Sequence, residues 1–273
     1  MKKLALSLLA MAGLAACGTT DTGAGEGAAT VRVGIVGSVT EVWDSVAERV
    51  ADHGIQLEII QFSDFNTPNT ALAQGEIEMN AFQHQFFLDT FNREAGTDIV
   101  SIGNTFNAPL GIYSEALANP SDIADGAQVA IPNDVTNGGR ALLLLQAAGL
   151  IEVDAAAGLT PSLSDVVSNP RNLEIVELAA DQTARALQDV AMSVINSGMA
   201  IEAGLVPEDD AIFLEPVDEN ARPYVNIIAV RGEDADNEIF QTIVDVFQTQ
   251  ETIDVAAEFT PASIPAWEAF GRK

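Results

Sequence analysis

Short β-branched strands alternate with helical segments from residue 31 onward, and this order limits the chain to few folds. Residues 31–36 (VRVGIV) predict a strand, and residues 41–53 predict a helix because Val42, Val46 and Val50 recur at helical spacing. The other elements of this first unit are predicted strands at 55–62 and 77–82, a short helix that opens at Thr67, and a helix at 85–95. A βαβαβα order predicts a mostly parallel sheet with helices on both faces.

A second unit of the same kind follows a short strand at residues 110–113. Its elements, with those that close the chain, are predicted strands at 128–131, 173–178, 193–195 and 224–230 and helices at 137–148, 183–188, 237–248 and 252–259. We therefore expect two lobes, with residues 31–109 and 229–273 in lobe 1, residues 113–224 in lobe 2, and crossings near 110–112 and 225–228. Because ligands bind outside the carboxyl ends of strands in open α/β sheets, the expected binding site is a cleft between the lobes.

The N-terminal sequence predicts export and lipid attachment. Two lysines follow Met1, the thirteen residues 4–16 are apolar, and the only cysteine is Cys17. An apolar run of this length is too short to cross a bilayer core of about 30 Å, so residues 1–16 are predicted to be a cleaved signal peptide. A cysteine at the cleavage point resembles a bacterial lipoprotein signal, in which the thiol is lipidated. A plain signal peptide with an incidental cysteine is the alternative.

The lipid on Cys17 would anchor the protein to the cell membrane, facing the periplasm or the cell exterior. Residues 17–30 are rich in glycine, alanine and threonine and predict a flexible tether between this anchor and the folded body. No later stretch of the sequence is long and apolar enough to predict a transmembrane helix.

The chain is strongly acidic, with a formal net charge of −28, which becomes −30 (−28 − 2) when the two lysines of the signal peptide are removed. Such a surface repels nucleic acid and anionic lipid, so we expect no nucleic-acid partner. A single cysteine excludes a disulfide within the chain. The remaining cations are nine arginines and Lys273, so an arginine away from the acidic surface is a functional candidate.

The sequence lacks the motifs of common enzyme classes. It has two histidines, His53 and His84, and it contains no HExxH, GxSxG or GKS/GKT motif and no Cys/His spacing typical of a metal site. We therefore expect a binding protein without cofactor, metal or catalytic residues. An enzyme built on the same lobes is the alternative.

Several candidate ligand contacts lie at the ends of predicted strands. Phe65 follows the second strand, Phe82 ends the third, and His84 comes two residues later. Arg140 lies at the start of the helix at 137–148, where the helix N-terminus and a guanidinium fork both suit a carboxylate. Each residue taken alone also fits a structural role, as a core aromatic, a helix-start histidine or a surface ion pair.

Two asparagines occupy strand positions, where this residue type is depleted. Asn196 ends the strand at 193–195, and Asn226 interrupts the apolar run YVNIIAV. A side-chain amide both donates and accepts hydrogen bonds, as a zwitterionic ligand requires. Capping of the backbone is the alternative for each.

From about Val31 to its C-terminus the chain resembles the NlpA/MetQ family of methionine-binding lipoproteins, the substrate-binding components of ABC importers. The segments that carry the resemblance are the lipobox, FSDFNTPNTAL, NAFQHQFFLD, IPNDVTNGGRALLLLQAAGLI, NPRNLEIVELAADQTARAL, SVINSGMAIEAGL and YVNIIAVR, in this order. The resemblance implies an α/β, type II-like, two-lobed periplasmic-binding-protein fold that closes over L-methionine or a close analogue. The implied partners are the membrane permease and ATPase of an importer, with the binding protein itself a monomer.

The resemblance implies a role for each matching residue. Arg140 and the helix start would hold the α-carboxylate, and Asn137, Asn196 and Asn226 would hydrogen-bond the head group. Phe82 and His84 would line the thioether pocket, and Tyr224 would lie near the hinge. The sequence departs from the family at Phe65, where tyrosine is frequent, at Gln85-Phe86, where Lys-Pro is common, and at Gly138-Gly139, where larger residues stand. Because these departures affect ligand preference, the alternatives are another small amino acid, D-methionine, methionine sulfoxide or a methionyl dipeptide. A surface lipoprotein without a transport role is a further alternative.

Overall fold

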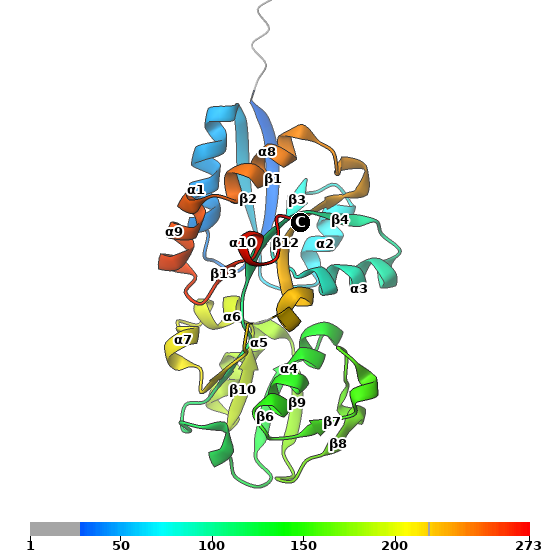
Figure 1. Cartoon of the computed structure of the whole chain (residues 1–273), viewed down its shortest axis with the longest axis vertical. Coiled ribbons are helices and arrows are strands. Elements are labelled where there is room, and N and C mark those ends of the chain that lie inside the picture. The colour runs from blue at the N-terminus through cyan, green and yellow to red at the C-terminus, as the bar shows by residue number, and fades with distance from the viewer. Residues whose placement is uncertain (1–27, 218) are drawn as a thin grey trace, which may run out of the picture.

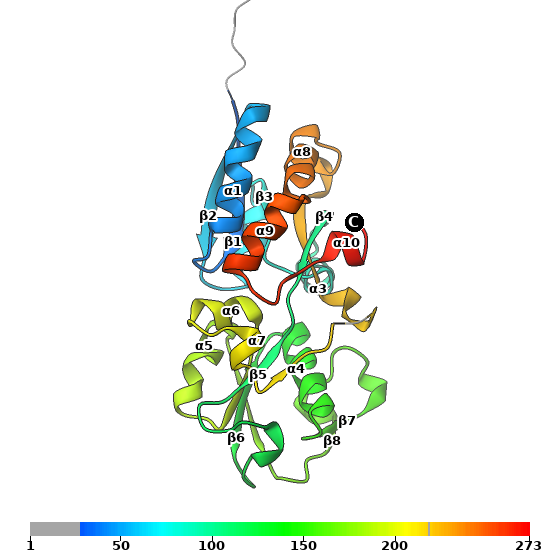
Figure 2. The ribbon, with the colours of Figure 1, turned by 60° about the vertical axis from the view of Figure 1, so that its left-hand side comes forward.

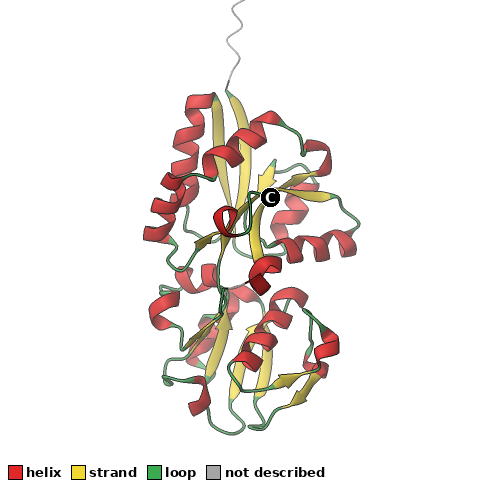
Figure 3. Cartoon of the chain, viewed as in Figure 1, coloured by secondary structure: helices red, strands yellow, loops and turns green. Residues whose placement is uncertain are grey.

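The computed structural model describes residues 28–217 and 219–273, which form two α/β lobes stacked along the long axis of the molecule (Figure 1, Figure 3). Lobe 1 contains a six-stranded sheet and lobe 2 a five-stranded sheet. The lobes remain distinct in the turned view (Figure 2). This architecture confirms the predicted two-lobed α/β fold. The signal peptide, Cys17 and most of the predicted tether lie outside the described residues.

Lobe 1 is built from the two ends of the described chain. Its strands, in sheet order, are β2 (Ile55–Phe62), β1 (Ala29–Val36), β3 (Met79–Asn80), β12 (Val225–Arg231), β4 (Ile99–Asn107) and β13 (Ile264–Pro265). Its helices are α1 (Glu41–Val50), α2 (Thr67–Ala73), α3 (Gln85–Ala95), α8 (Glu238–Phe247), α9 (Gln250–Phe259) and α10 (Ala266–Ala269). Strands β2, β1 and β3 are parallel and β12 is antiparallel to β3.

Lobe 2 repeats this strand pattern. Its sheet order is β9 (Glu174–Leu178), β6 (Gln128–Pro132), β10 (Met192–Ile195), β5 (Gly111–Tyr113) and β11 (Phe213–Leu214). The other elements are α4 (Val135–Ala147), α5 (Ala180–Thr183), α6 (Ser197–Glu202), α7 (Pro207–Asp210) and a separate antiparallel pair, β7 (Glu152–Val153) with β8 (Val166–Ser168). Strands β9, β6 and β10 are parallel, and β5 runs against β10.

The apolar residues that define the predicted elements form the cores of the two lobes. In lobe 1, Val33 of β1 and Val46 of α1 pack with Ile243 and Phe247 of α8, all of them buried. The equivalent core of lobe 2 lies between the sheet and the apolar run of α4. Each lobe therefore packs its helices against its sheet, and the carboxyl ends of the parallel strands point toward the other lobe (Figure 1).

Strand β4 is the largest element that the sequence pattern does not predict. Polar residues such as Ser101 and Asn104 break its apolar alternation, but the strand lies between β12 and β13, where the sheet satisfies its backbone. Strand β3 covers Met79–Asn80 instead of the predicted residues 77–82, and β1 already begins at Ala29.

The chain crosses between the lobes at positions that differ from the predicted ones. Residues 111–112 belong to strand β5 of lobe 2, and residues 225–228 belong to strand β12 of lobe 1. Strand β12 pairs with β4 from Val225 to Arg231. The first crossing therefore lies between Asn107 and Gly111, and the second between Leu214 and Val225. None of the helices in the described ranges has the length and apolarity that a bilayer crossing requires.

Candidate ligand-binding site

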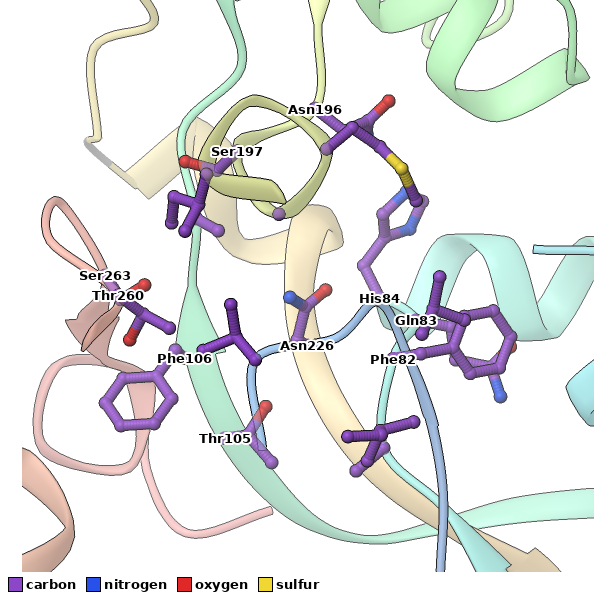
Figure 4. Close-up of a pocket in the computed structure, with 18 of the residues that line it drawn as sticks. Phe82, Gln83, His84, Thr105, Phe106, Asn196, Ser197, Asn226, Thr260 and Ser263 are labelled. Atoms are coloured by element: carbon purple, nitrogen blue, oxygen red, sulfur yellow. The ribbon is translucent and has the colours of Figure 1, made fainter. Parts of the chain in front are cut away.

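A cavity of about 210 Å³ lies between the lobes, where the strands of both sheets end. Lobe 1 contributes Val36 at the end of β1, Phe82 and His84 after β3, and Asn226 on β12. Lobe 2 contributes the first turns of α4 and α6. Figure 4 shows Asn196 and Ser197 at the start of α6 across the cavity from Asn226 and Thr105. The cavity occupies the place that the strand order predicts for a ligand.

Arg140 lines this cavity and is only 4% exposed, but its guanidinium already has a protein partner. Its Nε donates to Oε1 and Oε2 of Glu215 at 2.9 and 3.1 Å, and its Nη2 also bonds this carboxylate. Nη2 donates in addition to the carbonyl of Ala108 at 3.1 Å. Within the described part of the chain Nη1 has no hydrogen-bond partner, so this nitrogen is the donor left for a ligand.

Tyr224 supports Arg140 from behind. The Arg140 Cζ lies 4.3 Å from the centre of the Tyr224 ring, a cation–π contact, and the ring also meets His84 edge to face at 5.4 Å. Tyr224 is buried and is not among the residues that line the cavity. Burial raises the pKa of its hydroxyl, so the ring stays neutral beside the ion pair.

A chain of polar side chains joins α6 to the start of α4. Asn196 Nδ2 donates to Asn137 Oδ1 at 3.0 Å, and Asn137 Nδ2 donates to both carboxylate oxygens of Asp134. Asp134 also caps α4 by accepting from the backbone N–H of Asn137. Both the oxygen and the nitrogen of the Asn137 amide therefore have partners, whereas Asn196 Oδ1 and the nearby Ser197 Oγ are buried without a partner among the described residues.

His84 caps α3, and its other nitrogen has no well-formed hydrogen bond within the described ranges. Its Nδ1 accepts from the backbone N–H of Phe87 at 2.9 Å. Burial and, to a smaller extent, the charge of Arg140 together lower the pKa of His84 to about 3, against a smaller opposing effect of Asn137. A neutral ring whose Nδ1 accepts must carry its proton on Nε2, a buried atom for which no hydrogen bond of acceptable geometry is found in the described chain. His84 is thus a neutral donor at the cavity.

Three phenylalanines form one wall of the cavity. Phe65 and Phe82 have ring centres 6.0 Å apart, and Phe87 meets both rings nearly edge-on at 6.4 and 5.9 Å. All three rings are partly exposed to the cavity. A cluster of this kind presents ring faces and edges to an apolar or sulfur-containing group.

Seven of the eight predicted contact residues line the cavity. They are Phe65, Phe82, His84, Asn137, Arg140, Asn196 and Asn226. The structure places the eighth, Tyr224, behind Arg140. Residues that the sequence did not indicate as contacts include Phe87, Ser197, Met199 and Trp43. Phe87 lies three residues after the His84 cap and therefore on the same side of α3. This helical spacing is the sequence feature from which Phe87 could have been predicted as a contact residue.

The two small residues at the start of α4 have a packing reason. A Cβ on Gly138 would lie 2.8 Å from the carbonyl oxygen of Pro132, and one on Gly139 would lie 2.9 Å from the carbonyl oxygen of Leu159. Both neighbours are backbone atoms, which cannot rotate away. The glycines therefore let α4 lie close to the end of β6 and to the loop at Leu159. This close approach fixes the position of Arg140, which follows Gly139 in the helix.

Acidification is expected to destabilise the folded chain through His84. Between about pH 6.5 and 3 the unfolded chain binds a proton on this residue and the folded chain does not, so stability falls as the pH falls through this window. Thermal melting of the wild type and of His84→Gln across the window measures the effect, with the exposed His53→Gln as control. The advantage of the wild type over His84→Gln should shrink at low pH; a constant difference would refute the assignment.

In the described ranges no group of three or more His, Cys, Asp or Glu side chains converges to hold a metal ion. The site instead combines a guanidinium, a neutral imidazole, amides and aromatic rings between two lobes. This fold and this site define a solute-binding protein of the two-lobed periplasmic-binding-protein class.

Comparison with known proteins identifies the family. The NlpA lipoprotein family model matches residues 31–267, so the chain belongs to this family. The D-methionine-binding lipoprotein MetQ of Escherichia coli strain K12 is 40% identical over 242 residues, which cover 87% of this chain and 88% of the relative. The family resemblance predicted from the sequence is confirmed.

Solved structures show the same architecture. The protein PG110 from Staphylococcus aureus has a TM-score of 0.84 and 43% identity, over 86% of this chain and 93% of that chain. A nutrient-binding protein from Burkholderia cenocepacia, solved bound to methionine, has a TM-score of 0.83 and 38% identity, over 86% of this chain and 99% of that chain.

Proposed function

We propose that this protein binds methionine, or a close analogue, in the cavity between its lobes and delivers it to the permease and ATPase of an ABC importer. The observation that carries the proposal is a set of polar atoms around the cavity that have no hydrogen-bond partner among the described residues. Arg140 Nη1 and His84 Nε2 are donors, whereas Asn196 Oδ1 and Ser197 Oγ can accept. Buried polar groups need partners, and a bound zwitterion supplies them.

The two kinds of unpartnered atom match the two charges of an amino acid. The donors on Arg140 and His84 suit the α-carboxylate, and the acceptors on Asn196 and Ser197 suit the α-ammonium group. Asn226 on the facing strand β12 completes the head-group site. Asn137 acts on the ligand by holding Asn196 in place.

The phenylalanine cluster suits the side chain of methionine. A thioether beside an aromatic edge is favourable by about 0.3–1.5 kcal/mol, and burial of its methylene and methyl groups adds to this. Phe65 carries no hydroxyl, so this wall offers contact without a hydrogen bond. Relatives of similar length bind methionine or D-methionine by name, which supports this ligand class.

The setting proposed for this binding step is the outer face of a membrane. Cys17 would carry the lipid anchor after removal of residues 1–16, and the two lobes of a monomer would close on the ligand. Closure follows when the ligand contacts both lobes and so binds the closed state better than the open one. We propose no chemical step, because the contacts at the cavity suit binding of an unchanged ligand.

A thermal-shift panel tests the ligand class. L-Methionine, D-methionine, methionine sulfoxide, a methionyl dipeptide and alanine are added at equal concentrations to the purified protein. A ligand present at about 100 times its Kd stabilises the folded state by about 2.7 kcal/mol and raises the melting temperature. We expect L-methionine or one of its analogues to give the largest shift and alanine a small one. No shift with any thioether compound would refute the proposal.

A further inference from the structure

Glu215 holds Arg140 to the first crossing between the lobes. The carboxylate accepts two bonds from Arg140 Nε and a third from Nη2, and its Oε2 accepts from the backbone N–H of Leu110 at 3.1 Å. The backbone N–H of Glu215 in turn donates to the carbonyl of Leu110 at 2.9 Å. Arg140 Nη2 binds the carbonyl of Ala108, two residues earlier. The ion pair thus clamps α4 to the chain that joins β4 to β5.

Glu215 acts on a ligand only through Arg140. Its side chain is 16% exposed and lies behind the guanidinium, and it does not line the cavity. The pair occupies Nε and Nη2 and leaves Nη1, so the carboxylate decides which edge of the guanidinium faces the cavity. Bidentate pairing of this kind fixes the plane of the guanidinium group.

The pair also sets the charge that a ligand meets. His84 is neutral because burial keeps its pKa low, and the amides of the site carry no charge. The positive charge of Arg140 is balanced at hydrogen-bond distance by Glu215, so the lining of the site is close to neutral. A neutral, weakly solvated site favours a ligand without net charge over an anion or a cation of the same shape.

We infer that Glu215 is a positioning residue that makes the cavity select a zwitterion, by holding Arg140 and balancing its charge. This inference rests on the proposed binding of methionine. Without the carboxylate, Arg140 would present an uncompensated positive charge. Anions would then gain affinity and cations would lose it.

Three probes that differ in charge and little in shape test the inference. They are L-methionine, methylthiobutanoate, which is methionine without its amino group, and L-methioninamide, which lacks the carboxylate. Titration calorimetry gives the Kd of each for the wild type and for Glu215→Gln, which keeps the size of the side chain and removes its charge. The ratio of the Kd for the anion to the Kd for the cation should fall by about tenfold or more in the variant.

Glu78→Gln is the matched control, because Glu78 forms a comparable pair with Arg32 in lobe 1, with bonds of 2.6 and 3.0 Å to Nη2 and Nε. It should leave the ratio unchanged. Glu215→Met is a second neutral variant in case Glu215→Gln does not fold. An equal weakening of all three probes would show that Glu215 is only structural and would overturn the inference while methionine binding stands. A wild type that does not bind methionine would overturn the proposed function and this inference with it.

Discussion

Replacement of Arg140 by alanine is expected to weaken methionine binding by about 2–5 kcal/mol. The change removes the Nη1 donor from the cavity and leaves the Glu215 carboxylate largely buried without its cationic partner. It also frees the carbonyl of Ala108 at the first crossing. Titration calorimetry of the folded variant, checked by circular dichroism, measures the loss.

Arg32→Ala provides the control for this experiment. Arg32 pairs with Glu78 on the outer part of lobe 1, and neither residue lines the cavity. Its removal should leave the Kd for methionine within about twofold of the wild-type value, because the pair does not line the cavity. A change of less than threefold in Arg140→Ala would show that the guanidinium does not contact the ligand.

Replacement of Phe82 by alanine is expected to weaken methionine binding by about 1–3 kcal/mol. Phe82 contacts both other rings of the cluster, Phe65 and Phe87, so its loss opens the wall proposed to face the thioether. The loss should be smaller for alanine as ligand, because alanine does not reach this wall. Calorimetric titration with both ligands measures the difference.

Phe213→Ala is the control for Phe82→Ala. Phe213 packs against the core of lobe 2 and is partly buried like Phe82, but it is absent from the cavity lining. It should lower the melting temperature without changing the Kd for methionine. Equal effects of the two variants on binding would argue that the aromatic cluster acts through stability alone.

The fold could be predicted where one local pattern decides the structure. The strand at Ile55–Phe62 and the helix at Gln85–Ala95 have the predicted bounds. Gly54 comes directly before the strand, and Gly96 comes directly after the helix. Strand β4 could not be found in this way. Its backbone pairs with β12 and β13, which come more than a hundred residues later in the chain.

The site shows the same division between local and long-range information. Arg140 and Asn196 could be proposed from their places at a helix start and a strand end. Glu215 could not, because a glutamate in an acidic sequence is unremarkable until the fold places it against Arg140, 75 residues away. That contact changes the expectation for Arg140, whose guanidinium keeps one nitrogen without a partner in the described residues instead of an open fork.

The departures at Gly138 and Gly139 are likewise explained only by the fold. A side chain at either position would collide with a backbone carbonyl. These glycines thus reflect the close approach of α4 to its neighbours, and they do not line the cavity themselves.

The most direct measurement is a calorimetric titration of the ligand-free protein with L-methionine. The account predicts saturable binding of one molecule per chain with a Kd of about 1 μM or tighter, which corresponds to about −8 kcal/mol or more. The absence of heat and of any saturable binding, in a folded protein freed of bound ligand by unfolding and refolding, would contradict the claim that the interlobe cavity is a methionine site.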